Sequence, residues 1–203
     1  DMSIDLTFLQ GEGIETDLRR RDFTINAIAF SLQNETFHAA ENSMEDIASK
    51  VIRVVSNDSI DQDPLRMLRA IRYFCSLNGF IMDGNLKEEI SLKKEKILSL
   101  PGERIKTELD QILLSPQPAI GMESLYESNL FLTFFPEFRG LESIHQGNHH
   151  HLNVLPHVLL MIGKVSSALE WIAHQGMMIA LTEEDRLSLY YAALFHDIGK
   201  QDT

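Results

Sequence analysis

The sequence contains little that would place the protein outside the cell or in a membrane. Its single cysteine, Cys75, excludes an internal disulfide, so the expected location is a reducing cytoplasm. No apolar run reaches the ~18 residues of a membrane-spanning helix, and we expect no contact with a membrane. The first residues, DMSIDLTFLQ, are neither a signal peptide nor a transit peptide. They also lack an initiator methionine, so we expect the chain to be a fragment of a longer protein.

Positive charge is scarce overall and unevenly distributed. Lysine and arginine total 18 against 30 acidic residues, a formal net charge of -12. This balance argues against a generic nucleic-acid binder, because such proteins neutralise phosphates with basic side chains. Seven of the ten arginines, however, lie between residues 19 and 72. The N-terminal third therefore has a basic character that the total hides.

The sequence also lacks internal repeats and low-complexity tracts, and its hydrophobic pattern is mainly helical. Short β-branched or alternating runs predict strands at 3–9 and 50–56. A helix is predicted over 18–30, with Asp17 as its N-cap. The chain after residue 59 is predicted to form helices at 63–79, 85–98, 102–114, 117–129, 153–173 and 183–199. The predicted fold is mostly α-helical, with a small mixed α/β segment in front of a helical body.

The stretch DLRRRDFTIN, residues 17–26, concentrates positive charge at the predicted start of the first helix. Each cation at a helix N-terminus costs about 0.3–1 kcal/mol, since that end already carries partial positive charge. The same end binds anions through its free N–H groups, and arginines bind phosphate. The stretch therefore predicts a phosphate site, with a solvated cluster of charges as the alternative.

The predicted helix over 63–79 has an apolar face and a charged face. Asp63 and Arg66 lie opposite the apolar arc, one turn apart and within reach of an ion pair. One interpretation is an ordinary surface pair of small energetic value. The other is a fixed set of donors and acceptors that reads the Watson–Crick edge of a base. The apolar arc consists of Leu65, Leu68, Ile71 and Cys75.

Three segments together resemble a known family. RRDFTINAIA (20–29), DPLRMLRAIRYF (63–74) and ERIKTELDQILL (103–114) resemble motifs of class II tRNA nucleotidyltransferases and bacterial poly(A) polymerases. Members add CMP and AMP, or AMP alone, to RNA 3′ ends without a nucleic-acid template. The resemblance implies a polymerase-β-like head followed by a helical neck and body. It also implies ATP or CTP with Mg²⁺, and tRNA or another RNA 3′ end as partner.

The resemblance assigns roles in the arginine stretch. Arg20 and Arg21 would bind the triphosphate of the incoming nucleotide. Asp22, together with Asn26, would contact its ribose. Asp5, on the first predicted strand, is a candidate for a further carboxylate near the metals, and a surface aspartate is the alternative.

The other two motifs carry the recognition of the base. By the resemblance, Asp63 and Arg66 would act as an amino-acid template for the base. Glu103 and Arg104 would support the neck helices beneath that template. The residue before the aspartate, usually glutamate in the family, is Gln62 here.

Two features of the family are missing from the sequence. The Gly-Gly…Arg-Asp segment and the Asp-x-Asp pair, which hold the metals, are absent, so the chain by itself is expected to be inactive. In the flexible link of the head, Ala39 and Ser43 replace an aspartate and a glycine, and only Asp46 matches. This change favours an enzyme that uses a single nucleotide.

A second group of candidate functional residues lies near the C-terminal end of the sequence. ALFHDIGK contains His196 and Asp197, and HHHLNVLPHVLLMI upstream contains His157. This pattern resembles the HD phosphohydrolase superfamily, in which a His, a His-Asp pair and a later Asp bind a divalent metal. Lys200 would lie near a phosphate, and residues 149–151 are predicted to form a polar loop. The alternative is a satisfied His–Asp pair in the core, because such groups must be paired when buried.

The predicted domains are a remnant of the nucleotidyltransferase head at 1–57, a helical neck and body at 58–140, and the start of an HD domain at 141–203. The leading functional hypothesis is an RNA 3′-end nucleotidyltransferase acting in tRNA processing. Two alternatives remain: a metal-dependent HD phosphohydrolase and a non-catalytic, RNA-binding helical module.

Overall fold

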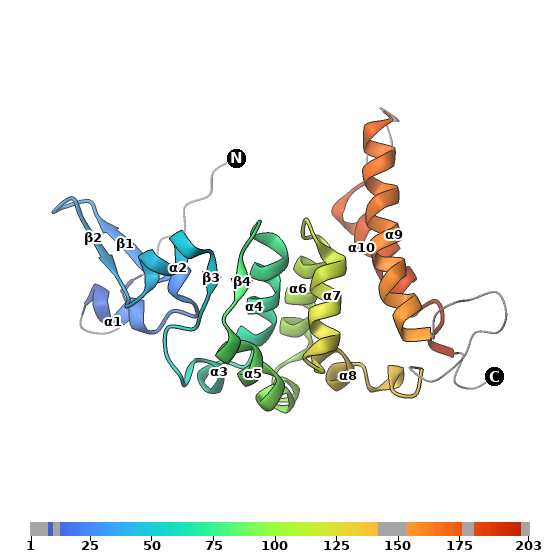
Figure 1. Cartoon of the computed structure of the whole chain (residues 1–203), viewed down its shortest axis with the longest axis horizontal. Helices are drawn as coiled ribbons and strands as arrows, with labels where there is room; N and C mark the ends of the chain where they lie inside the picture. Colours follow the sequence, from blue (N-terminus) through green and yellow to red (C-terminus); the bar gives the residue numbers. More distant parts are fainter. Residues whose placement is uncertain (1–7, 10–12, 142–153, 176–180, 200–203) are drawn as a thin grey trace.

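The protein is elongated, and its elements follow one another along the long axis (Figure 1). The structure, a computed structural model, describes residues 8–9, 13–141, 154–175 and 181–199. A small α/β head lies at one end, a group of helices in the middle, and a pair of long helices at the other end. The predicted fold class is confirmed: the chain is mostly helical with a small α/β head.

The head is built around a hairpin that the hydrophobic pattern did not predict. β1 and β2 pair antiparallel, with Ile28 opposite Ala39, and Phe30 contacts Phe37 across the strands. The predicted helix over 18–30 is therefore wrong, because pairing with a later strand overrides the local pattern. The elements are α1 (Ile14–Arg19), η1 (Thr24–Asn26), β1 (Ile28–Ser31), β2 (Thr36–Ala39), α2 (Ser43–Ser49) and β3 (Val51–Ile52).

Asp46 of α2 is the polar anchor of the head. Its side chain is almost fully buried and accepts a hydrogen bond of 2.7 Å from the hydroxyl of Thr24. It also pairs with Arg53 at 3.1 Å. The predicted strand at 50–56 is confirmed only in part: β3 has two residues, and Val54 adds an isolated bridge to Phe23. Asp46 therefore joins three segments of the head.

A group of short helices follows the head. β4 pairs in parallel with β3 and so connects this group to the head, a pairing that the sequence did not indicate. The predicted helix over 85–98 is divided into α5 and η2. The elements are α3 (Ser59–Gln62), α4 (Arg66–Ser76), β4 (Ile81–Met82), α5 (Gly84–Lys93), η2 (Lys94–Ser99), α6 (Gly102–Leu113), α7 (Pro118–Glu127), α8 (Leu130–Phe134) and η3 (Pro136–Phe138).

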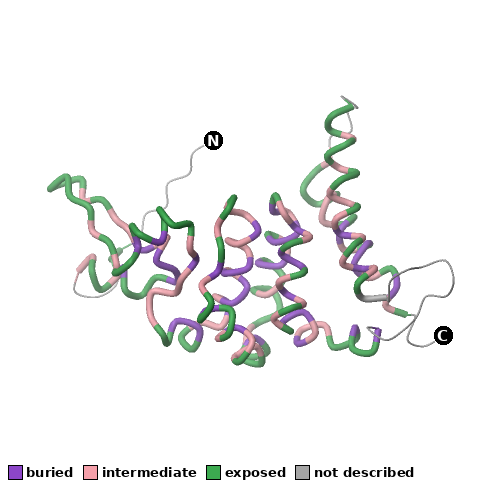
Figure 2. The backbone as a smooth tube through the Cα atoms, in the orientation of Figure 1, coloured by how far each residue is buried: buried purple, intermediate pink, exposed green. Residues whose placement is uncertain are grey.

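The centre of the core lies where α4, α6 and α7 pack together. Figure 2 shows buried residues concentrated on these helices. The backbone of α7 comes close at Gly121, where a Cβ would lie 2.6 Å from Ile112 and 3.1 Å from the sulfur of Cys75. Burial raises the pKa of the Cys75 thiol. This cysteine is therefore a packing residue rather than a reactive one.

Two long helices, α9 (Val154–His174) and α10 (Glu183–Phe195), form the other end of the molecule (Figure 1). A capping box between Thr182 and Asp185 fixes the start of α10. The helix ends at Phe195 rather than at the predicted residue 199. Among the described residues, no helix is both long and apolar enough to cross a membrane.

Several predicted features lie outside the described residues or among residues without regular structure. Phe8 and Leu9, the described part of the predicted strand at 3–9, are not in a strand. Asp5, Lys200 and residues 149–151 lie outside the described ranges.

Candidate functional site

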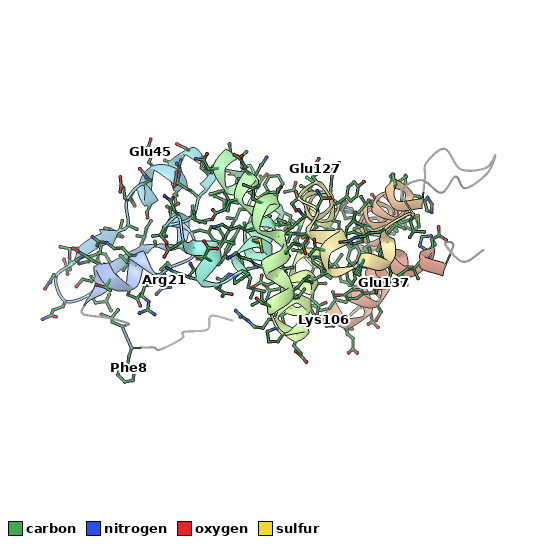
Figure 3. All side chains as sticks on the ribbon, turned by 90° about the horizontal axis from the view of Figure 1, so that it is seen from below. Phe8, Arg21, Glu45, Lys106, Glu127 and Glu137 are labelled. Carbon is green, nitrogen blue, oxygen red and sulfur yellow. The ribbon has the colours of Figure 1, made fainter. Side chains whose placement is uncertain are left out.

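The arginine stretch lies at the C-terminal end of a helix, not at an N-terminus. α1 ends at Arg19, and Arg20 is its C-cap. Asp17 lies inside α1 rather than capping a later helix, and pairs with Arg21 at 3.1 Å. Cations at a helix C-terminus are favourable, so the predicted electrostatic cost does not arise. Arg19, Arg20 and Arg21 (the last labelled in Figure 3) all remain exposed, so the stretch still offers positive charge to a ligand.

Asp22 is the buried centre of the arginine turn, which we define as residues 20–22. Its Oδ1 accepts hydrogen bonds from the backbone N–H of Phe23 at 2.8 Å and from the amide of Asn26 at 3.2 Å. Its Oδ2 pairs with a guanidinium nitrogen of Arg69 on α4 at 2.7 Å. The structure therefore brings together the predicted ribose pair, Asp22 and Asn26, and adds a cation from the neighbouring helix.

Arg66 connects the start of α4 to the arginine turn. Its Nη2 donates to the backbone carbonyl of Arg20 at 2.8 Å, and its Nη1 donates to the hydroxyl of Ser59 at 2.7 Å. That hydroxyl donates in turn to the carbonyl of Asp22 at 3.3 Å. Arg66, the residue expected to read the base, thus contacts Arg20, expected to hold phosphate, directly and Asp22, expected to face the ribose, through Ser59.

Asp63 pairs with Arg104 rather than with Arg66. Its Oδ2 lies 2.9 Å from a guanidinium nitrogen of Arg104 on α6, and its Oδ1 accepts from the N–H of Leu65. The predicted ion pair within one turn of helix is wrong because α4 begins at Arg66 and Asp63 precedes it in extended backbone. Arg104, expected to support the neck helices beneath Asp63, contacts Asp63 itself, whereas Glu103 is exposed on the first turn of α6.

Two arginines of α4 were not predicted as functional residues. Arg69 contacts Asp22, and Arg72 pairs at 2.7 Å with the buried Glu108 of α6. With Arg66 they repeat every three residues, so all three lie along one side of a largely buried helix. That spacing is the signal that the sequence offered. Their partners could not be identified from it, because they lie on other elements.

The three predicted ligands near the C-terminal end of the chain lie together. The Nε2 atoms of His157 and His196 are 3.9 Å and 3.2 Å from Oδ2 of Asp197. One ligand atom from each residue lies within 4.8 Å of the others. The Nδ1 atom of His196 is 2.8 Å from the carbonyl of Ala193. Since a carbonyl only accepts, this contact needs the proton on Nδ1, so Nε2, the nitrogen that faces Asp197, is the one that could bind a metal.

Within the described parts of the chain, this is the one such group of three potential ligands. Two imidazoles and a buried carboxylate suit a divalent transition metal. Near the arginine turn, by contrast, Asp22, Asp46 and Asp63 are all engaged in ion pairs. These described carboxylates do not fit a Mg²⁺ site for nucleotidyl transfer.

Two family models match separate parts of the chain. Residues 6–53 match the family model of the poly A polymerase head domain. Residues 79–141 match the model of the probable RNA- and SrmB-binding site of polymerase A.

Two curated relatives match nearly the whole chain. The A-adding tRNA nucleotidyltransferase of Deinococcus radiodurans is 32% identical over 195 residues, which cover 94% of this chain and 42% of the relative. The CC-adding tRNA nucleotidyltransferase of Thermus thermophilus is 31% identical over 205 residues, which cover 98% and 43%. The chain therefore spans less than half the length of these relatives.

A solved structure of a tRNA-processing enzyme has the same fold. It matches with a TM-score of 0.70 and 26% identity, covering 94% of this chain and 52% of that one. The head model and the RNA-binding model match in the order in which the three motifs occur, and relatives and structure agree with them. The chain therefore belongs to the class II tRNA nucleotidyltransferase and poly(A) polymerase family.

Proposed function

We propose that the whole protein adds nucleotides to the 3′ end of an RNA, with tRNA as the leading acceptor, and that this chain supplies the nucleotide-recognition part of the site. One observation carries the proposal: Arg66 of α4 hydrogen-bonds the backbone of the arginine turn, so base and phosphate recognition are adjacent. The names of the two relatives, A-adding and CC-adding tRNA nucleotidyltransferase, support the same reaction class. The free, buried Cys75 is consistent with the cytoplasm as the location.

Arg20 and Arg21 would hold the triphosphate. Both side chains are exposed at the end of α1, and guanidinium groups bind phosphate oxygens in a bidentate manner. Arg21 is also paired with Asp17, so it would exchange a carboxylate for a phosphate on binding. Asp22 and Asn26, directly behind the arginines, would face the ribose.

Asp63 and Arg66 would read the base. Each is already held by fixed partners: Arg104 and the N–H of Leu65 for Asp63, and Ser59 and the carbonyl of Arg20 for Arg66. Partners of this kind hold side chains in place while the remaining donors and acceptors stay available to a ligand. Mg²⁺, which the family resemblance implies, would neutralise the phosphates and activate the attacking hydroxyl when bound. The described residues position the nucleotide and leave the metal ligands to other residues, among which Asp5 remains a candidate.

The direct test offers labelled ATP and CTP, each with tRNA, to the full-length protein. Incorporation of one or both nucleotides at the RNA 3′ end is the expected result. The replacement of the link residues by Ala39 and Ser43 favours one nucleotide over a mixture of both. If neither nucleotide is incorporated under conditions in which a known tRNA nucleotidyltransferase is active, the proposal is wrong.

A second candidate function is metal-dependent phosphohydrolysis at His157, His196 and Asp197. It is supported by the position of their ligand atoms: one atom from each residue lies within 4.8 Å of the others, and Asp197 is buried. A divalent metal bound there would act as a Lewis acid on a phosphoryl oxygen. The test is hydrolysis of bis(p-nitrophenyl) phosphate by full-length protein supplied with Mn²⁺ or Zn²⁺. Activity that is unchanged in a His157→Ala variant would exclude these residues as its source.

A further inference from the structure

Helix α4 holds the arginine turn at two points. Arg66 donates to the backbone carbonyl of Arg20 at 2.8 Å. One helical turn further along, Arg69 lies 2.7 Å from the carboxylate of Asp22. The same helix therefore carries the residue proposed to read the base and a residue that touches the one proposed to face the ribose.

The contact between Arg69 and Asp22 differs from the other contacts of that carboxylate. Phe23 and Asn26, which bind Oδ1, belong to the same turn as Asp22 and move with it. Arg69 belongs to another element, so it sets where the carboxylate lies relative to α4. With 6% of its surface exposed, Asp22 has little freedom to lie elsewhere.

The pair also retains unused hydrogen-bonding capacity. Although Oδ2 of Asp22 is close enough to Arg69 for an ion pair, it has no hydrogen bond of suitable angle, and neither does Nε of Arg69. Buried polar atoms normally have such partners. Both atoms are closed off from solvent, so at this point Asp22 and Arg69 depend on each other rather than on water.

We propose that Arg69 is a positioning residue for ribose recognition, which holds Asp22 in place from the helix that also carries Arg66. The proposal rests on the nucleotidyl-transfer function proposed above. Without Arg69, Asp22 would be a buried carboxylate without its cation, a state that costs free energy unless the side chain turns toward solvent. Such a turn would take Asp22 away from the ribose while leaving Arg20 and Arg21 exposed to the triphosphate.

The pKa of Arg69 agrees with this role. Burial alone would lower it, but a hydrogen bond with Tyr73 and the charge of Asp22 outweigh burial and raise it. The guanidinium is thus charged at every pH at which an enzyme of this kind is assayed.

The test compares full-length wild type with Arg69→Gln, Arg69→Lys and Arg72→Gln. For each protein, kcat/KM is measured with the nucleotide that the wild type incorporates and with its 2′-deoxy analogue, on the same tRNA. Arg72→Gln is the matched control, because Arg72 is also on α4 and also pairs with a buried carboxylate, that of Glu108, but does not touch Asp22. Thermal melting confirms that each variant is folded at the assay temperature.

We expect Arg69→Gln to lower the ribose-to-deoxyribose ratio of kcat/KM at least tenfold. Arg72→Gln should leave that ratio within twofold of the wild type. Arg69→Lys retains the charge but not the planar fork, so a smaller loss of at least threefold is expected. If Arg69→Gln does not fold, the result with Arg69→Lys decides the test.

An unchanged ratio in the folded Arg69 variants, or an equal loss in Arg72→Gln, would overturn the proposal. Incorporation by the wild type is a separate readout. If the wild type incorporates no nucleotide, nucleotidyl transfer itself is wrong; if it does and the ratios do not change, only the role of Arg69 is wrong.

Discussion

The hydroxyl of Tyr191 on α10 donates a 2.6 Å hydrogen bond to the carboxylate of Asp110 on α6, across 81 residues of sequence. Lys106, one turn earlier on α6, pairs with the same carboxylate at 2.6 Å. α6 also carries Arg104, which contacts Asp63 near the arginine turn. One helix therefore joins the proposed base-reading residues to the helix that precedes the His–Asp pair.

Replacing Tyr191 with phenylalanine should weaken the attachment of α10. A hydrogen bond to a charged acceptor contributes about 1.5–3 kcal/mol, so Tyr191→Phe is expected to lower the free energy of unfolding by an amount in that range. Chemical denaturation measures the loss. No change in the free energy of unfolding would show that the contact contributes nothing to stability.

The same contact predicts a dependence of stability on pH. Burial, followed by the hydrogen bond to Asp110, raises the pKa of Tyr191 in the folded protein. The unfolded tyrosine loses its proton first, near pH ~10. Its contribution to stability is therefore complete below about pH 10 and is lost as the pH rises further. The loss of stability between pH 9 and 11, compared in wild type and Tyr191→Phe by urea titration, should be smaller in the variant.

The close approach of α7 to its neighbours makes Gly121 intolerant of a side chain. Its Cβ would lie 2.6 Å from Ile112, so Gly121→Ala forces a shift in the core that costs about 1–3 kcal/mol. This exceeds the gain of up to about 1 kcal/mol in helix propensity. Gly163→Ala on α9 is the matched control, because its Cβ would make an ordinary 3.7 Å contact with Ala119. The control should be neutral or stabilising in thermal melting, and an equal loss in both variants would contradict the packing argument.

The His157, His196 and Asp197 group should bind a divalent metal in a pH-dependent manner. Imidazoles bind metals in the neutral form, so protons compete with the metal and affinity should fall as the pH is lowered. Calorimetric titration of the full-length protein with Mn²⁺ or Zn²⁺ measures the affinity. His157→Ala should weaken binding at least tenfold, whereas His174→Ala, a histidine at the far end of α9, should not. Equal affinity in wild type and His157→Ala would exclude the site.

Much of the helical body could be predicted because its signals are local. The apolar spacing of the segments at 102–114 and 117–129 was sufficient to identify α6 and α7. The His and His-Asp motifs were also sufficient to predict three residues that the fold brings together. Whether they bind a metal, and where one domain ends and the next begins, stay predictions.

The head and the pairing of the site residues could not be read from the same signals. The residues after the arginines have a helix-like pattern, but they form β1 because β2 pairs with them. Asp63 and Arg66 have helical spacing, but α4 starts too late for the pair to form. The spacing of Arg69 from Arg66 places it on the same side of α4, but its partner, Asp22, lies on a distant segment and could not be identified from the sequence. In each case the prediction rested on a local pattern, and a contact between distant segments decided the structure.

The most direct test of the account is the base preference of the full-length protein after Arg66→Ala. The wild-type ratio of kcat/KM for ATP and CTP on the same tRNA is compared with that of Arg66→Ala and of Arg72→Ala, a control on the same helix. Removal of the residue proposed to read the base should bring the ratio close to one, while Arg72→Ala keeps the wild-type preference. A wild-type preference that survives unchanged in Arg66→Ala would contradict the proposed nucleotide-recognition site.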